Sequence, residues 1–391
     1  MNEEADGLPE RPDIRPADPR FSCGPCKKHP GWDISHLNLE SLGRNHRGKA
    51  TKQRLTDAIT RSHQLLGLPD DWKLGIVPGS DTGAFEMAIW SLLGSRPVDV
   101  IAWEAFSGDW VTDLKQLNFD NTRTFVSAYG EMPDLAELNS AHDIVTVYNG
   151  TTSGVRLPHL DWVDADREGL VLCDATSAAF AMPMDFSKLD VVTWSWQKVL
   201  GGEAAHGMLA LSPRAIERLE TTTPVYPLPK LFRLTKNGKL IDAIFTGGTI
   251  NTPSLLSVED LHAALDWAEG LGGVDALYQR TQSNFDCIDQ WVAQTAWVDW
   301  LPQNPAIRSP TSMCLRIVDA SFTARSAEEQ QQSIDRMVAS LEQEAVAYDI
   351  GNYRTAPPGF RIWGGSTIET SDLQALTPWL EWAYACEGGA A

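Results

Sequence analysis

Residues 169–202 read GLVLCDATSAAFAMPMDFSKLDVVTWSWQKVLGG, and they hold two short apolar runs that each end in polar residues. The first run ends at Asp174, and the second is followed by Gln197 and Lys198. Neighbouring strands lie about 4.8 Å apart, so strands at these runs would hold the carboxylate and the amine across the width of a small planar ring. Taken singly, a strand-end Asp and a surface Lys are both common. Their joint placement makes the pair a candidate site.

Five more apolar runs of this kind lie in the same half of the chain, at 74–78, 98–103, 123–128, 143–148 and 207–212. Short runs that alternate with turn and helix signals predict an α/β domain built on a mostly parallel seven-stranded sheet. Several runs end in polar residues, namely Ser80-Asp81, Asn149, Asp174 and Lys198. Ligands of open α/β sheets bind at the carboxyl ends of the strands, so these residues are the ones to examine.

The pattern changes after residue 255. Helical periodicity dominates 258–296, 326–344 and 371–386, whereas 312–319 and 359–363 resemble strands. This alternation predicts a small second α/β domain. We therefore expect an N-terminal arm and loop over 1–30, a large domain over 31–272 and a small C-terminal domain over 273–391.

The charge of the chain limits its partners. The 391 residues carry a formal net charge of −20, and 43% of them are hydrophobic. Repulsion opposes binding to nucleic acid or to an anionic membrane, so we expect neither as a partner, and an anionic substrate must meet a local basic pocket. Six scattered cysteines predict a reduced, cytoplasmic protein rather than a disulfide framework. No apolar stretch is long enough for a membrane span, and the acidic, proline-rich N-terminus is unlike a signal peptide.

A lysine and a carboxylate at adjacent strand ends match the needs of pyridoxal phosphate. The lysine condenses with the cofactor aldehyde, and the acid keeps the pyridine nitrogen protonated. The stretch VPGSDTGAFEMAIWSLLG (77–94) predicts a strand, a Gly-rich turn and an amphipathic helix whose N-terminus suits a phosphate. It has neither a Walker motif nor GxGxxG. An ordinary turn with Ser80 or Asp81 as the helix cap explains the stretch equally well.

Eight motifs, spread over nearly the whole chain, resemble those of the phosphoserine aminotransferases, which are class V, fold-type-I pyridoxal-phosphate enzymes. The motifs are FSCGPCKKHPG (21–31), HRGK (46–49), PGSDTGAFE (78–86), NGTTSG (149–154), DATSA (174–178), WSWQKVLGG (194–202), GGTINTPS (247–254) and APPGFRIWGG (356–365). The resemblance implies a homodimer with shared active sites. It also implies transfer of an amino group between glutamate and 3-phosphohydroxypyruvate, giving phosphoserine and 2-oxoglutarate in serine biosynthesis. The phosphorylated hydroxythreonine precursor of vitamin B6 is a further candidate substrate.

The resemblance also assigns roles to individual residues, and no metal is expected among them. Lys198 would bind the cofactor aldehyde and Asp174 would face the pyridine nitrogen. The remaining cofactor contacts would come from Ser80, Asp81, Thr151 and Gln197, with Asn251 and Thr252 reaching the phosphate from the partner subunit. Substrate would be bound by Ser22, His46, Arg47, Arg354 and Arg361, since the planar arginine fork pairs with carboxylate and phosphate.

Two positions depart from the family pattern. Many bacterial members have arginine at the position of Asp81, so backbone donors and the partner subunit must carry more of the phosphate binding here. Those members also stack a tryptophan on the cofactor ring, and the match places Phe106 there, with Trp103 and Trp110 as the alternatives.

The N-terminal loop contains Cys23-Gly-Pro-Cys26, the sequence of the thioredoxin redox centre. A redox centre needs a preceding strand and a following helix that lowers the thiol pKa. Prolines precede the motif and Lys27-Lys28-His29-Pro30-Gly31 follows it, which favours a loop. By resemblance, Ser22 is the functional residue of this loop and both cysteines are incidental.

Three other functions compete with this interpretation. A cysteine desulfurase would need a loop cysteine and usually a histidine before the lysine, where this chain has Gln197; Cys287 and Cys314 lie in a predicted helix and strand. A serine–glyoxylate or alanine–glyoxylate aminotransferase differs only in the substrate arginines and the N-terminal loop. A cofactor-sensing transcription regulator would need a DNA-binding module, which the short proline-rich N-terminus cannot supply.

Overall fold

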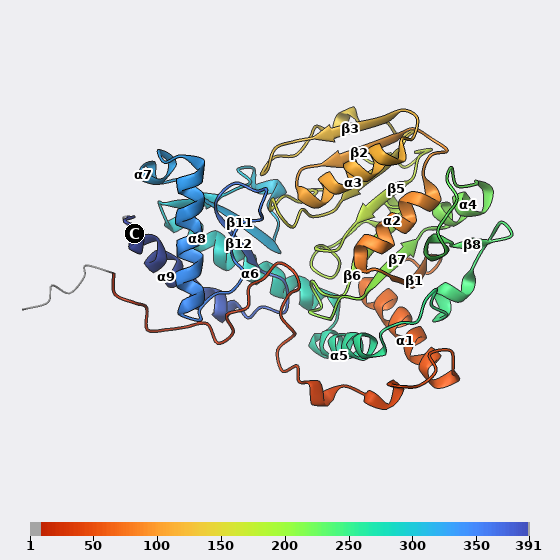
Figure 1. Ribbon diagram of the computed structural model, residues 1–391, viewed down its shortest axis with the longest axis horizontal. Coiled ribbons are helices and arrows are strands. Elements are labelled where there is room, and N and C mark those ends of the chain that lie inside the picture. Colours follow the sequence, from red (N-terminus) through yellow and green to blue (C-terminus); the bar gives the residue numbers. More distant parts are fainter. Residues whose placement is uncertain (1–8, 390–391) are drawn as a thin grey trace, which may run out of the picture.

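The computed structural model describes residues 9–389. Two parts stand side by side in Figure 1, a larger one built on a broad sheet and a smaller one that holds the C-terminal helices. Within the described residues, no helix is long and apolar enough to cross a bilayer.

The larger part is built on a seven-stranded sheet with the order β1-β7-β6-β5-β4-β2-β3. All neighbours are parallel except β7, which runs antiparallel to both β1 and β6. This confirms the predicted mostly parallel sheet, and each strand falls on a predicted run. The strands are β1 (Lys73–Pro78), β2 (Val98–Ala102), β3 (Thr122–Val126), β4 (Asp143–Val147), β5 (Val171–Asp174), β6 (Val191–Ser195) and β7 (His206–Leu211).

Five helices belong to this part: α1 (Lys49–Leu66), α2 (Ser80–Leu92), α3 (Ala105–Leu117), α4 (Pro213–Thr221) and α5 (Leu255–Leu271). Local signals explain their ends. Glu104 and Ser107 form a capping box that starts α3, and Gly67, in the left-handed conformation at φ 71°, ends α1. Our expectation that α2 is amphipathic is wrong: eight of its 13 residues are buried, because it packs on β6 and β7 and also contacts α4.

The smaller part has a three-stranded antiparallel sheet with the order β10-β11-β12. Its strands are β10 (Val298–Trp300), β11 (Ser312–Ile317) and β12 (Phe360–Trp363), and its helices are α6 (Val274–Gln294), α7 (Ala320–Thr323), α8 (Ala327–Gln343) and α9 (Thr370–Cys386). The sequence patterns indicated all of these except β10 and α7, which are too short to show a period. Helix α6 ends at residue 294, two residues before the end of the predicted helical stretch, and β10 begins after that stretch.

The N-terminal segment crosses the smaller part before it reaches the sheet (Figure 1). The indole N–H groups of Trp379 and Trp382 on α9 donate to the carbonyls of Ile14 and Pro9, at 2.8 and 3.1 Å. Further along, the Trp363 amide donates to the Phe21 carbonyl at 3.0 Å. The segment is therefore tied to α9 and β12 up to the loop that begins at residue 22.

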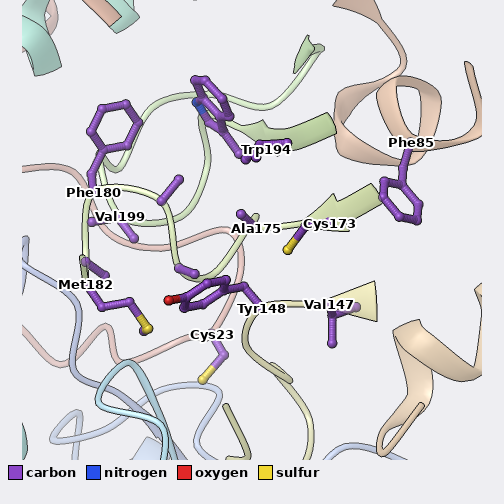
Figure 2. Close-up of a cluster of buried hydrophobic side chains, with 14 of the residues drawn as sticks. Cys23, Phe85, Val147, Tyr148, Cys173, Ala175, Phe180, Met182, Trp194 and Val199 are labelled. Carbon is purple, nitrogen blue, oxygen red and sulfur yellow. The ribbon is translucent and has the colours of Figure 1, made fainter. Parts of the chain in front are cut away.

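A continuous apolar core lies behind the carboxyl ends of the central strands, and Figure 2 shows part of it. Trp194 of β6 packs edge-on against Phe180, with ring centroids 5.9 Å apart. Cys23 of the N-terminal loop belongs to the same cluster and is 1% exposed. The loop is thus held by core packing, which positions its backbone next to the strand ends.

Candidate active site

A cavity of about 250 Å³ opens at the carboxyl ends of β4, β5 and β6. It brings together seven of the sequence-predicted residues, which come from five separate segments of the large part. Its wall consists of Gly24, Pro25, Ser80, Asp81, Thr82, Glu104, Phe106, Trp110, Val147, Asn149, Thr151, Asp174, Thr176, Ser177, Gln197, Lys198 and Ala204. We refer to it below as the sheet-end cavity.

Lys198 and Asp174 lie in this wall because β5 and β6 are adjacent and parallel, with Asp174 paired to Thr193. Lys198 is buried, and its Nζ donates a short hydrogen bond to the Cys23 carbonyl. Its Nζ also lies 5.9 Å from the centre of the Trp363 ring. Within residues 9–389, no carboxylate is bound directly to this buried amine, which leaves it free to approach a ligand in the cavity.

Two N–H groups hold the Asp174 carboxylate. Its Oδ1 accepts from the Thr176 amide at 3.0 Å, and its Oδ2 accepts from the Trp110 indole at 3.3 Å. These two hydrogen bonds fix the orientation of the Asp174 carboxyl group in the cavity wall.

The structure separates the three aromatic candidates. Phe106 lines the cavity and is 37% exposed, while Trp110 lines it with its indole bound to Asp174. Trp103 is buried outside the cavity wall, and its indole N–H donates to the Val155 carbonyl at 3.1 Å. Phe106 is thus the aromatic side chain of the three that has a free face toward the cavity.

The start of α2 forms one side of the cavity. Gly79 and Ser80 both adopt positive φ angles, of 85° and 53°, and no side chain caps this helix. The first N–H groups of a helix have no partner within it, so they can meet an anion. Nearby, the buried Oε1 of Gln197 has no hydrogen-bond partner among the described residues. Apart from Lys198, however, the charged side chains of the wall are the carboxylates of Asp81, Glu104 and Asp174.

Glu104 and Asn149 complete the wall. Glu104 accepts from the hydroxyl of Thr152 at 2.7 Å, and burial raises its pKa. Asn149 donates to the Ser177 hydroxyl at 2.9 Å, while its own Oδ1 is buried and has no hydrogen-bond partner within residues 9–389. Asn149 follows β4 and was among the strand-end residues to examine. Glu104 was missed, although it follows a predicted apolar run in the same way.

The N-terminal loop meets the cavity through its backbone. Gly24 and Pro25 line the cavity, and a Cβ on Gly24 would lie 2.4 Å from the Lys198 Nζ. Ser22 lies just outside, where its hydroxyl accepts from the Gly24 amide at 3.2 Å. Cys23 and Cys26 are buried free thiols, and burial raises the pKa of both. A thiol with a raised pKa is a poor nucleophile, so the loop lacks the chemistry of a redox centre.

Arg354 and Arg361 meet at one aromatic side chain beside the cavity. Each guanidinium carbon lies 5.6 Å from the centre of the Tyr353 ring, and this ring lies 5.6 Å from that of Phe106. The Nε of Arg361 is buried and has no hydrogen-bond partner in the part of the chain that the structure describes. Two cations therefore border the side of the cavity on which Phe106 lies.

His46 and Arg47 lie elsewhere, in a second cavity of about 500 Å³. Its wall is rich in cations and includes His46, Arg47, Lys52, Lys230, Arg233 and the segment 247–250. Asn251 and Thr252 follow that segment, are exposed, and do not line the sheet-end cavity. One chain therefore does not bring these four predicted residues to Lys198. We call this second site the basic cavity.

The sheet-end cavity fits pyridoxal phosphate by the chemistry of its wall. It offers a buried amine, a hydrogen-bonded carboxylate, an uncapped helix start and unpaired buried oxygens on Asn149 and Gln197. It has no cation other than Lys198 in its wall for the cofactor phosphate. One chain thus supplies the lysine and the carboxylate that the cofactor ring needs, but it supplies no cation for the cofactor phosphate other than Lys198.

Similar proteins were found by sequence and by structure, although no family model matches the chain. The chain is 54% identical to the phosphoserine aminotransferase of Methanosarcina mazei over 375 residues, which cover 96% of this chain and 99% of that protein. The phosphoserine aminotransferase of Bacillus circulans subsp. alkalophilus is 17% identical, with a TM-score of 0.77 and coverage of 94% and 99%. The ureidoglycine–glyoxylate aminotransferase of Bacillus subtilis also has a TM-score of 0.77, at 13% identity and coverage of 97% and 96%. The solved structures of two enzymes named for different substrates match this chain with the same TM-score, so the fold alone does not identify the substrate.

Proposed function

The chain belongs to the phosphoserine aminotransferase family, and we propose that the sheet-end cavity is its active site. The cofactor of the family is pyridoxal phosphate, and its reaction transfers an amino group between glutamate and 3-phosphohydroxypyruvate. One observation carries the proposal: Lys198 and Asp174 line one cavity at the carboxyl ends of two adjacent parallel strands. Sequence identity, rather than fold, favours this family over the glyoxylate aminotransferases.

When bound, pyridoxal phosphate supplies an aldehyde that takes up the amino group and a ring that accepts the electron pair released at the substrate α-carbon. We assign to Lys198 the binding of that aldehyde and, once its amine is free, the movement of the α-carbon proton. We assign to Asp174 the protonated ring nitrogen, with the Trp110 indole and the Thr176 amide orienting the carboxylate. Phe106 would stack on the cofactor ring, and Thr151 would contact the side of the ring that carries the hydroxyl group. The start of α2, with Ser80 and Gln197, would bind the cofactor phosphate.

Arg361, with Arg354 beside it, is our candidate for the substrate α-carboxylate. Its buried Nε lacks a hydrogen-bond partner, and burial without one is costly unless a ligand provides it. Ser22 lies on the adjoining loop and would contact the same substrate.

We propose that the distal anion of the substrate and the cofactor phosphate are bound with help from a second copy of the chain. The basic cavity would supply His46 and Arg47, and the exposed segment after it Asn251 and Thr252. Large apolar side chains are exposed near these segments, among them Leu39, Leu42, Leu231 and Leu256. Burial of such side chains would favour a homodimer. The described cysteines are all free thiols, which suits the cytoplasm as the compartment.

A direct assay tests the proposed function. The purified protein, loaded with pyridoxal phosphate, should convert glutamate and 3-phosphohydroxypyruvate into 2-oxoglutarate and phosphoserine. Parallel reactions with glyoxylate plus serine or alanine, and with phosphohydroxythreonine, rank the other candidate substrates. A higher kcat/KM with glyoxylate than with 3-phosphohydroxypyruvate would refute the proposal.

Replacement of Arg47 and of Arg361 should distinguish recognition of the distal anion of the substrate from recognition of its α-carboxylate. A charge-assisted hydrogen bond contributes about 1.5–3 kcal/mol, equal to roughly 10- to 150-fold in kcat/KM. Arg361→Ala should therefore lower kcat/KM for phosphoserine and alanine alike. Arg47→Ala should lower it for phosphoserine but barely for alanine, which has no distal anion.

Arg44→Ala is the matched control, because Arg44 is an exposed arginine three residues before Arg47. This variant should keep the wild-type kcat/KM for both phosphoserine and alanine, measured at fixed ionic strength so that long-range electrostatic steering is constant. Equal losses for phosphoserine and alanine in Arg47→Ala would argue against a distal-anion role and would favour a glyoxylate type of enzyme.

Dilution should test the shared site. If a second copy completes the phosphate site, then conditions that yield monomers should also release the cofactor, because binding and association are linked. Sedimentation and cofactor fluorescence can be followed over the same concentration range. A monomer that keeps the full cofactor affinity would contradict the shared site.

A further inference from the structure

Asp81 is an unusual residue for the wall of a cofactor site. It is the second residue of α2, its side chain faces the sheet-end cavity, and it is 7% exposed. Its Oδ1 is buried without a hydrogen-bond partner among the described residues. The start of α2 would bind the cofactor phosphate, and an ionised Asp81 carboxylate there would repel that phosphate and compete with it for the positive end of the helix. The residue therefore needs an explanation other than phosphate binding.

Asp81 and Asp174 line the same cavity, and α2, which holds Asp81, packs against β5, which ends at Asp174. Burial and the Asp174 charge raise the pKa of Asp81 well above its usual range, and the hydroxyls of Thr193 and Thr176 lie beside it. Two adjacent buried carboxyls cannot both ionise cheaply, so one of them holds a proton. Asp174 already accepts two N–H hydrogen bonds. Burial and the neighbouring charge favour the neutral form of Asp81, so we place the proton on Asp81.

We propose that Asp81 is a positioning residue whose neutral carboxyl donates its O–H to the Asp174 carboxylate, holding it toward the pyridine nitrogen of the cofactor. The inference rests on the proposed function, because the ring nitrogen matters only if the cavity binds that cofactor. It explains why a carboxylic acid is tolerated at the start of α2. It also completes a set of three donors to Asp174: the Trp110 indole, the Thr176 amide and the Asp81 hydroxyl.

The other titratable groups near Asp81 are compatible with a neutral acid. Cys173 on β5 senses the charges of Asp174 and Asp81, and burial raises its pKa well above the usual range, so it stays a thiol. His206, at the start of β7 opposite Pro78, stays neutral because burial lowers its pKa to about 4. Glu104 and Lys198 share the cavity wall, and burial raises the pKa of Glu104. Lys198 is the cation among these groups, and its Nζ donates to the Cys23 carbonyl rather than to Asp81.

Two substitutions separate the hydrogen bond from the shape of the side chain. Asp81→Asn keeps the size and retains an N–H donor for Asp174, but it cannot ionise. Asp81→Leu keeps the branched arrangement of side-chain heavy atoms and has no donor. Asp109→Asn, an exposed carboxylate on α3, is the control.

The first readout uses the protein without cofactor and is independent of its function. A buried acid with a raised folded-state pKa stabilises the fold fully only below its unfolded pKa, and this contribution is lost as the pH rises through the folded pKa. The melting temperature of Asp81→Asn should therefore fall less than that of wild type between pH 5 and pH 8. An infrared band of a protonated carboxyl group should be present in wild type and absent from Asp81→Asn, while Asp109→Asn should match wild type in both measurements.

The second readout uses the loaded enzyme. Asp81→Asn should keep at least about tenfold more kcat/KM for phosphoserine than Asp81→Leu, the effect of one hydrogen bond to a charged group. Nitrogen NMR of labelled cofactor should show a protonated ring nitrogen in wild type and Asp81→Asn, and a lower apparent pKa of that nitrogen in Asp81→Leu. Equal ring-nitrogen pKa values in Asn and Leu variants, or no protonated carboxyl in wild type, would overturn the inference. A wild-type enzyme inactive toward phosphoserine would instead refute the proposed function, while the cofactor-free measurements would still decide the state of Asp81.

Discussion

Replacement of Lys198 by alanine is expected to abolish transamination and to remove the visible absorbance band of the lysine-bound cofactor. Among the residues that the structure describes, Lys198 is the only lysine in the wall of the sheet-end cavity, and its Nζ donates to the Cys23 carbonyl. The variant would lose both the amine that binds the aldehyde and the base that moves the α-carbon proton. Loss of a general base alone costs about 10²- to 10⁴-fold in rate, so we expect at least that decrease in kcat.

Absorbance spectroscopy and single-turnover assays with glutamate measure both effects. Lys115→Ala is a suitable control, because Lys115 is an exposed lysine on α3, and it should keep the band and the rate. A visible band that persists in purified Lys198→Ala would show that another amine binds the cofactor, and the assignment of Lys198 would then be wrong.

Replacement of Asp174 by alanine is expected to leave some cofactor binding but to remove most of the activity. Without the carboxylate, the ring nitrogen loses its proton and becomes a poor acceptor for the electron pair of the α-carbon. Loss of one charge-assisted hydrogen bond alone corresponds to a decrease in kcat/KM of roughly 10- to 150-fold, and the unprotonated ring lowers kcat/KM further. We therefore expect kcat/KM for phosphoserine to fall by about 10²-fold or more.

The binding and the chemistry can be measured separately for Asp174. Cofactor titration gives the dissociation constant, and steady-state kinetics at saturating cofactor give kcat/KM. Asp174→Asn should resemble the alanine variant in rate, since an amide cannot hold the ring proton, whereas Asp109→Asn should behave as wild type. Activity of Asp174→Ala within a few-fold of wild type would mean that another group faces the nitrogen.

Much of the fold and part of the site follow from local sequence patterns. Each strand of the large sheet coincides with a short apolar run, and in the central strands β2, β4, β5, β6 and β7 burial on both faces demands continuous apolar residues, whereas the edge strand β3 is largely exposed. The short β10 was missed because three residues cannot display a period. The packing of α2 was misjudged because a helix buried on most sides lacks the polar face by which an amphipathic helix is recognised.

The residue pattern alone was enough to indicate the sheet, the pairing of Asp174 with Lys198 and the chemistry that this pair supports, because strand-end positions follow from periodicity and parallel pairing. Other contacts could be seen only in the folded chain: the Cys23 carbonyl at Lys198, Tyr353 between Phe106 and the two arginines, and Asp81 against Asp174. Each of these joins segments that are far apart in sequence. Their distances depend on how the N-terminal loop, α2 and the small domain pack on the sheet, and no local pattern encodes that packing.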